Sequence, residues 1–262
     1  DLADIERIEV LRGPQGTLFG KNATAGVISV TTARPSREFE GRGEVTIAEH
    51  DEYRARGTVS GPISDTLRAR VTGFYNDVRG VARNIATDSW DNGSKSWGVR
   101  GKLERDATEN LNLLFTGEYR KTEADCCAST WIAINNPNLQ TLVGPINATR
   151  ENRTLNDETV TSSNSDQQTY SLQADWDLGA ATLTSITAYQ DYYLEVNQPI
   201  ERINSDVPLF VGASAAYSNW NRNGGALDIG AFSQELRIAN NDSGNFNYVA
   251  GVFYMHSDIK RP

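Results

Sequence analysis

Charged side chains recur at every second position along several stretches of this chain, where their chemistry would be the binding of ions. The basic members are Arg54, Arg56, Arg68, Arg70, Arg100, Lys102, Arg120 and Arg237, and the acidic members are Glu104, Glu118, Asp175, Asp177 and Glu235. Residues two apart lie on one face of a strand, so these side chains would share a surface. That surface could attract an anionic ligand, or its acids and bases could pair across strands. Both explanations stay open, and under the first we select Arg54, Arg56 and Arg120 as candidate ligand-binding residues.

Aromatic residues in long polar stretches are the second candidate for binding. Trp131, Phe210, Tyr217 and Trp220 stand among polar and acidic residues without strand periodicity. Loops on a rigid scaffold often carry binding residues, and an aromatic ring there could stack on a planar group or a macrocycle. The same rings could instead pack the loops together. We select Trp131 and Trp220 as candidate ligand contacts.

Other reactive residue types are too few or badly spaced for catalysis. The only histidines are His50 and His256, and the sequence contains neither G-x-S-x-G nor H-E-x-x-H. Cys126 and Cys127 are adjacent, and a bond between neighbours closes a strained ring. Two cysteines also cannot complete a structural zinc site. We therefore expect unpaired or loosely oxidised thiols, no enzyme activity, no metal site and no cofactor.

The composition excludes one class of partner. The net charge is −9 and the isoelectric point is near 4.8, whereas nucleic-acid binding calls for a basic surface. No run of 18 apolar residues is present, so the sequence predicts no transmembrane helix.

The elements that position the charged residues are predicted to be β-strands. Small or apolar residues alternate with polar ones over about nine segments, as in half-exposed strands. Along 182–194 the two faces are ambiguous, because Leu183 and Tyr189 fall on one side and Ile186 and Ala188 on the other. The predicted strands are 44–48, 53–60, 67–76, 96–104, 111–120, 170–178, 182–194, 232–238 and 248–254.

The connections between these strands alternate in length. Short turns are expected near 62–66 (Gly61-Pro62-Ile63-Ser64-Asp65), 105–109, 179–180 and 241–245, and long loops near 77–94, 122–165 and 195–230. Only the connection near 50–52 is short at the long-loop end. In an antiparallel meander alternate connections lie at opposite ends, so one end would carry the short turns and the other the loops. That arrangement is typical of an outer-membrane β-barrel.

Aromatic residues on the apolar face support the barrel over a soluble β-sandwich, which also alternates. They lie near predicted strand ends, where a membrane barrel carries girdles at the lipid headgroups. A sandwich would explain neither these girdles nor the one-sided loop lengths. The residues concerned are Tyr53, Tyr75, Trp97, Tyr119, Tyr170 and Trp176.

Residues 5–35 form a strand, a glycine-rich loop and a second strand. The loop superficially resembles a phosphate-binding loop, but Gln15 replaces the first glycine and Asn22 the Ser/Thr, and a strand follows where that motif needs a helix. The stretch IERIEVLRGP, then LFG, then NATAG and the strand to Thr32 closely resembles the end of the plug domain of TonB-dependent outer-membrane receptors.

The resemblance implies the rest of the architecture. The family plug is a mixed α/β domain that fills a 22-stranded barrel. We therefore expect residues 1–36 to be the C-terminal part of the plug and 37–262 the N-terminal part of a transmembrane antiparallel β-barrel. The fold class would be mainly β, with about nine strands of a partial barrel. Family members use an arginine at the position of Arg12 to lock the plug to the barrel wall, so Arg12, Gly13, Pro14 and Gly20 are the expected locking residues.

The implied function is import of a scarce ligand across the bacterial outer membrane. The expected partners are TonB with ExbB and ExbD, through a segment upstream of Asp1, together with outer-membrane lipid and a small-molecule ligand. An iron–siderophore complex is the family's commonest cargo, while cobalamin, nickel chelates and oligosaccharides stay open. The alternative is a non-transporting β-rich adhesin or binding module on the cell surface. Under the receptor interpretation, the charged residues of the sheet could pair with one another and with carboxylates of the plug in place of binding an anionic ligand.

Overall fold

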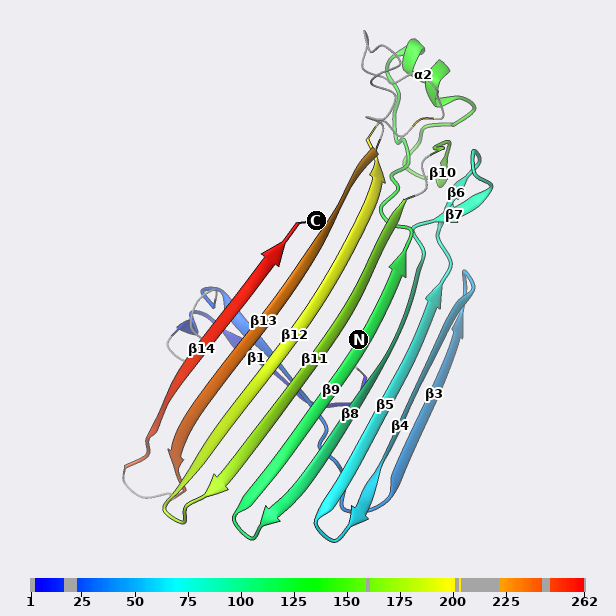
Figure 1. Cartoon of the computed structure of the whole chain (residues 1–262). Helices are drawn as coiled ribbons and strands as arrows, with labels where there is room; N and C mark the ends of the chain where they lie inside the picture. The colour runs from blue at the N-terminus through cyan, green and yellow to red at the C-terminus, as the bar shows by residue number, and fades with distance from the viewer. Residues whose placement is uncertain are drawn as a thin grey trace.

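One large antiparallel sheet dominates the computed structural model, which describes residues 3–16, 23–158, 161–200, 203, 222–241 and 246–261. Over these residues nine strands pair in the order β14-β13-β12-β11-β9-β8-β5-β4-β3 (Figure 1). All nine coincide with the strands predicted from the alternating pattern. They are β3 (Glu40–Ala48), β4 (Glu52–Ser64), β5 (Leu67–Val78), β8 (Ser94–Thr108), β9 (Leu111–Ala124), β11 (Ser162–Asp177), β12 (Ala181–Pro199), β13 (Arg222–Asn240) and β14 (Val249–Lys260).

The short turns lie at one end of this sheet and the long connections at the other, as predicted (Figure 1). One turn was misplaced: Gly61 to Ser64 belong to β4, and the chain reverses at residues 65–66. The register shifts between Pro62 and Ser64. Such a bulge admits a proline into a strand, which explains why a turn-like sequence is extended here.

Several strands continue farther toward the long loops than the alternation predicts. β11 begins at Ser162, β12 runs to Pro199 and β13 begins at Arg222. The backbone ladder continues there, with Ser163 opposite Val196. Both faces of the β11 extension are polar, so the sequence there shows no period of two although the backbone is fully paired.

Small elements fold over the long-loop end. They are β6 (Ala82–Asn84), β7 (Ser89–Asp91), β10 (Thr154–Leu155) and α2 (Pro137–Val143). β6 pairs with both β7 and β10. Val143 and Ile146 form a small buried cluster with Ile203. The Asn136 carboxamide caps the helix by accepting a hydrogen bond of 2.9 Å from the Asn138 backbone N–H.

The outward face of the sheet carries a row of aromatic residues toward the long loops and Trp176 near the short turns. Tyr75 lies opposite Trp97, and the Trp97 and Tyr119 ring centroids are 5.2 Å apart. Farther along the same row Tyr170 lies opposite Tyr189. Trp176, opposite Leu183, lies near the short turns instead. Aromatic residues at the margins of an apolar face are typical of the lipid-facing surface of a membrane barrel.

Cross-strand register also settles the ambiguous strand. Leu183 and Tyr189 face outward, because their partners on β11 are the outward Trp176 and Tyr170. The intervening Ser185 and Thr187 therefore also face outward. Their hydroxyls bond the Gln234 side chain at 3.0 and 2.6 Å, so these polar groups satisfy one another.

A separate hairpin, β1 (Ile5–Arg12) and β2 (Gly26–Thr32), lies behind the sheet in Figure 1. Its open end is closed by a hydrogen bond of 3.1 Å from the Ala33 N–H to the Asp4 carbonyl. β3 then starts at Glu40. The division at residues 36 and 37 stays a prediction. Among the described residues, no helix has the length and apolar character needed to cross a membrane.

Candidate functional site

The inner face of the sheet, which the hairpin contacts, collects the charged residues in two layers. We call Arg68, Arg70, Thr72, Arg100, Lys102 and Glu104 the lower wall, and Arg54, Arg56, Phe74 and Arg120 the upper wall. Cross-strand register aligns each layer. Arg70 lies opposite Lys102, and Arg56 lies opposite Phe74, which is four residues along β5 from Arg70 toward the long loops. The period of two therefore brings residues from four strands onto one surface.

The strongest contact of the lower wall joins Arg70 to Asp4 of the hairpin. The Arg70 Nε donates to Asp4 Oδ2 at 2.6 Å and Nη2 donates to Oδ1 at 2.5 Å. Thr72 Oγ1 donates to the same carboxylate at 2.9 Å, and Arg70 Nη1 also reaches Glu40 at 2.6 Å. Only 11% of the Arg70 side chain and 8% of the Asp4 side chain are exposed. Two parallel bonds in a largely buried place fix both position and orientation.

These contacts set the protonation state of Asp4. Burial raises the pKa of Asp4, but the hydrogen bonds from Arg70 and Thr72 and the positive charge of Arg70 outweigh it. The net result is a pKa below the ordinary value of 3.8. Asp4 is therefore an anion at neutral pH, as its pairing with Arg70 requires.

Backbone carbonyls at the base of the hairpin are also held by the wall. Lys102 Nζ donates to the carbonyls of Thr32 and Ala33 at 2.9 and 2.8 Å. Arg100 Nη1 donates to the Ala3 carbonyl at 3.2 Å, while its Nε donates to Glu118 at 2.6 Å. These carbonyls lie where the hairpin ladder ends, so wall cations supply the partners that a neighbouring strand would otherwise give.

Arg34 extends the attachment toward the short turns. Its guanidinium lies 3.2 Å from Glu104 and 3.3 Å from Asp175 on β11. Arg68 shares Glu104 at 3.6 Å and forms a bidentate pair with Asp106 at 3.0 and 3.1 Å. The lower wall is thus occupied by the hairpin and by its own carboxylates, which is the pairing explanation stated for these residues above.

The upper wall contains the three predicted ligand-binding arginines. Arg56 donates to Glu44 at 2.9 Å, and Arg54 pairs with Glu52 two residues away on its own strand. Arg120 lies over the Phe74 ring at 5.9 Å. All three line one concavity, together with Thr46, Asn76 and Ser96. The side chains of Arg54 and Arg56 stay 56% and 47% exposed, so these cations can reach a further anion. Ligand binding by these residues stays a prediction.

Arg12, Gly13 and Pro14, three of the four predicted locking residues, lie at the other end of the hairpin from Asp4. Arg12 is exposed and opposite Gly26. Gly13 has a φ of +84°, a conformation that favours glycine, and its N–H donates to the Ala25 carbonyl at 3.2 Å. Pro14 follows in the same turn, whereas Gly20 lies outside the described residues. The locking role of these four residues stays a prediction.

Of the aromatic residues considered as ligand contacts, the structure describes Trp131 but not Phe210, Tyr217 or Trp220. Trp131 is partly buried and packs against the Val143, Ile146 and Ile203 cluster in the loop after β9. This is the loop-packing alternative stated for the aromatic residues, and it leaves ligand contact by Trp131 as a prediction.

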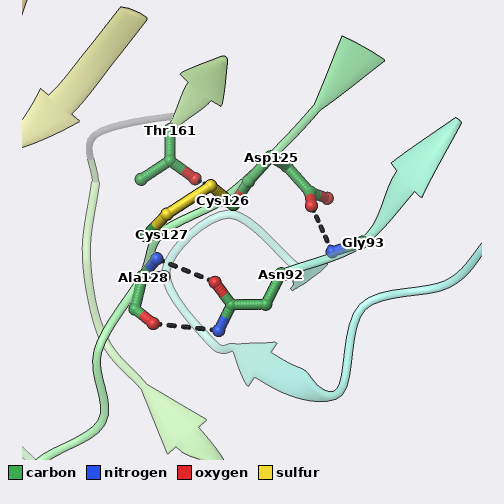
Figure 2. The surroundings of a disulfide bond; sticks show 7 residues. All are labelled: Asn92, Gly93, Asp125, Cys126, Cys127, Ala128 and Thr161. Carbon is green, nitrogen blue, oxygen red and sulfur yellow. Dashed lines mark hydrogen bonds between the residues drawn. A yellow bond between two sulfur atoms is a disulfide. The ribbon is translucent and has the colours of Figure 1, made fainter. Parts of the chain in front are cut away.

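Two features were missed or wrongly expected. The hairpin residues Asp4 and Arg34 were not among the candidate residues, although both are charged and flank the two strands. The cysteines were expected to be unpaired or loosely oxidised, but Cys126 and Cys127 form a disulfide (Figure 2). Hydrogen bonds hold the residues on either side of them, so the bonded conformation is supported by its surroundings.

Comparisons with known proteins point in one direction. Residues 1–27 match the family described as TonB-dependent Receptor Plug Domain. The chain is 44% identical over 93 residues to the Pesticin receptor of Yersinia pestis, which covers 35% of this chain and 14% of that receptor. It is 34% identical over 79 residues to the Ferripyoverdine receptor of Pseudomonas aeruginosa, covering 29% of this chain and 10% of that receptor. The chain thus spans a small part of its curated relatives' length.

Solved structures show the same fold over nearly the whole chain. The ferric yersiniabactin uptake receptor FyuA from Yersinia pestis superposes with a TM-score of 0.75 at 21% identity, covering 97% of this chain and 36% of that one. The ferripyoverdine receptor of Pseudomonas aeruginosa gives 0.71 at 19% identity, covering 98% and 33%. The plug-domain match, the receptor relatives and the partial-barrel fold together support a fragment of a TonB-dependent outer-membrane receptor.

Proposed function

We propose that the receptor containing this chain imports an iron–siderophore complex across the bacterial outer membrane, driven by TonB with ExbB and ExbD. The observation that carries the proposal is the division of the inner wall. Lower-wall cations hold the hairpin in the barrel, while exposed arginines remain between the hairpin and the long loops. A ligand entering past the loops would meet these arginines before it met the plug.

The names of the relatives support the choice of cargo. The Pesticin receptor, the Ferripyoverdine receptor and the ferric yersiniabactin uptake receptor are receptors rather than enzymes, and two of the three names specify a ferric ligand. Ferric siderophores are commonly anionic, which fits Arg54, Arg56 and Arg120. The rival function, a surface adhesin, gives no reason for ion pairs that hold a plug hairpin inside a barrel.

Uptake of radioactive iron by cells carrying the full-length receptor tests the proposal. The cells would be offered ferric catecholate, hydroxamate and carboxylate siderophores, with and without TonB. We expect uptake of at least one complex, and its loss without TonB. Binding of the complexes to the cell surface without uptake would contradict import and favour the adhesin. Equal uptake with and without TonB would contradict TonB-driven import.

The arginines are tested by equilibrium binding of the transported complex. Losing two charge-assisted contacts in R54Q/R56Q should weaken binding at least about tenfold. The matched control is R37Q/R105Q, which removes two exposed arginines near the short turns. Unchanged affinity in R54Q/R56Q, or an equal loss of affinity in the control, would show that Arg54 and Arg56 do not bind the ligand.

The locking role of Arg12 has its own test. We expect Arg12→Ala in the full-length receptor to loosen the plug and to admit large antibiotics that the intact outer membrane excludes. The Arg7→Ala variant is the control, because Arg7 is an exposed arginine of the same strand whose Nε lies 3.4 Å from the exposed Glu9 carboxylate. Equal antibiotic sensitivity in the Arg12→Ala variant and the wild type would contradict the lock.

A further inference from the structure

The disulfide between Cys126 and Cys127 lies where the chain leaves β9 for the long loop to β11 (Figure 2). We propose that it is a thiol–disulfide exchange site, reacting with small-molecule thiols, whose redox state controls how firmly this loop is held at the mouth of the barrel. The proposal is independent of which ligand the receptor imports.

Both neighbours of the disulfide are held by the segment that opens β8. The Asn92 carboxamide accepts from the Ala128 N–H at 2.8 Å and donates to the Ala128 carbonyl at 2.9 Å. On the other side, the Gly93 N–H donates to the Asp125 carboxylate, and the Asp125 N–H donates to the Gly93 carbonyl at 3.3 Å. Figure 2 shows the disulfide between these two attachments. We call this set of contacts the loop clamp.

The clamp also reaches the other end of the same loop. Thr161, the residue before β11, donates its hydroxyl to the Asp125 carbonyl at 2.5 Å. The departing and returning ends of the loop therefore meet at Asp125. A groove lined by Gly93, Asp125 and Thr161 runs beside the clamp and opens it to solvent.

The disulfide fixes the spacing that the clamp needs. Asp125 and Ala128 are separated by the two cysteines alone, and both hold Asn92 or its neighbour. While the sulfur atoms are bonded, this four-residue segment has few conformations, and its hydrogen bonds form at little entropic cost. Opening the bond restores rotation to both cysteine side chains and the backbone between them, so the same hydrogen bonds must then order a flexible segment.

Ala128 lies three residues before Trp131, which contacts the rest of the loop, so a displacement of Ala128 would be passed to these contacts. The Trp131 carbonyl accepts a hydrogen bond of 3.0 Å from Asn152, and its ring packs against the Val143, Ile146 and Ile203 cluster. Arg150 and Arg153 flank Asn152, and Arg153 Nη1 donates to the Arg150 carbonyl at 3.2 Å. Tryptic cleavage at these arginines therefore reports how firmly the loop is held.

The exchange is a two-electron reduction in two steps. A thiolate attacks the sulfur of Cys127, the more exposed of the pair, and a mixed disulfide forms while Cys126 leaves as a thiolate and takes a proton. A second thiolate attacks the outer sulfur of the mixed disulfide. It releases Cys127 as a thiol and leaves the external reagent as its own disulfide. The external thiol is oxidised and the cystine is reduced.

The experiment treats the full-length receptor in detergent with millimolar glutathione and measures two quantities. Differential alkylation with mass spectrometry counts free thiols on the peptide that contains both cysteines. Limited trypsin digestion gives the cleavage rate at Arg150 and Arg153. We expect no alkylation before glutathione, two adducts after it, and a cleavage rate at least about fivefold higher, because proteolysis follows the population of the open loop.

Two variants separate the clamp from general loosening. C126S/C127S should be cleaved at the faster rate without glutathione and should not respond to it. Asn92→Ala keeps the disulfide but removes the contacts to Ala128, so it should also be cleaved faster before reduction, with little further change. Alkylation of both cysteines before reduction, or equal cleavage of the wild type before and after it, would overturn the proposal even if either variant failed to fold.

Discussion

The upper and lower walls both present arginines on the inner face of one sheet, yet their arginines are in opposite situations. Arg70 has 11% of its side chain exposed and contacts Asp4, Glu40 and, at 3.5 Å, the Arg34 carbonyl. The Arg56 side chain stays 47% exposed, and within the described part of the chain its carboxylate partner is Glu44. What distinguishes them is the base of the hairpin, which covers one layer and stops short of the other.

The comparison shows that an alternating charge pattern does not by itself define a ligand site. Both the lower and the upper wall contain arginines. The position of the hairpin base determines which of these arginines form ion pairs within the protein. A largely buried arginine with several partners contributes to the position of the plug, whereas an exposed arginine with one flexible partner can exchange it for a ligand. The following variants test this division in order of expected effect.

The largest effect is expected from Arg70→Ala. The substitution removes the charged hydrogen-bond donor of the buried Asp4 carboxylate, which keeps the Thr72 hydroxyl and the more distant charge of Lys102. Breaking a buried pair from one side costs about 3 kcal/mol. We would measure the urea midpoint for release of the hairpin, using a fluorophore on G16C in a C126S/C127S background. Arg56→Ala is the matched control on the same face, and its exposed pair should contribute less than about 1 kcal/mol.

Equal shifts in the two variants would contradict the division of the wall. The division of the wall would also be contradicted if the double variant D4A/R70A released its hairpin as easily as Arg70→Ala. Removing both partners eliminates the unpaired buried charge, so the double variant should recover part of the loss.

A smaller, pH-dependent effect is expected from Asp4. Its folded pKa lies below the ordinary value of 3.8, so the folded state favours the carboxylate. The stability from this pairing is therefore fully present above about pH 4 and is lost as the pH falls through the lowered folded pKa. The same urea midpoint, measured from pH 6 to pH 2.5, should fall more steeply in the wild type than in Asp4→Asn. Parallel curves would show that another group controls the acid response.

The strands and faces were predictable because their signal is local. The period of two along β5 or β9 predicts which residues share a face of the sheet. The lengths of the connections predict which end of the sheet carries the short turns and which the long loops. Where both faces are polar, as in Ser162 to Thr169 of β11, that signal disappears although the backbone ladder continues. The turn predicted near residues 62–66 was misplaced because a bulge and a turn favour the same residue types, and Pro62 lies at a bulge of β4.

The partners of the wall residues were not predictable in the same way. Asp4 and Arg70 are 66 positions apart, and several arginines of the wall fit an aspartate equally well in sequence terms. The choice among them depends on where the hairpin rests, which is a property of the folded barrel. The disulfide has a similar origin, because the contacts of Asn92 with Ala128 come from a loop 36 positions away.

The smallest effect is expected from Arg34→Ala, although Arg34 contacts two carboxylates. Its side chain is 43% exposed, and its partners keep other contacts: Glu104 retains Arg68 at 3.6 Å, and Asp175 retains the Thr184 hydroxyl at 2.8 Å. No buried charge is left alone, so the free energy of hairpin release should change by about 1 kcal/mol or less. The urea midpoint should therefore shift far less than in Arg70→Ala. A shift as large as that of Arg70→Ala would show that the number of ion pairs, rather than the contacts left to the remaining charge, determines how firmly the plug is held.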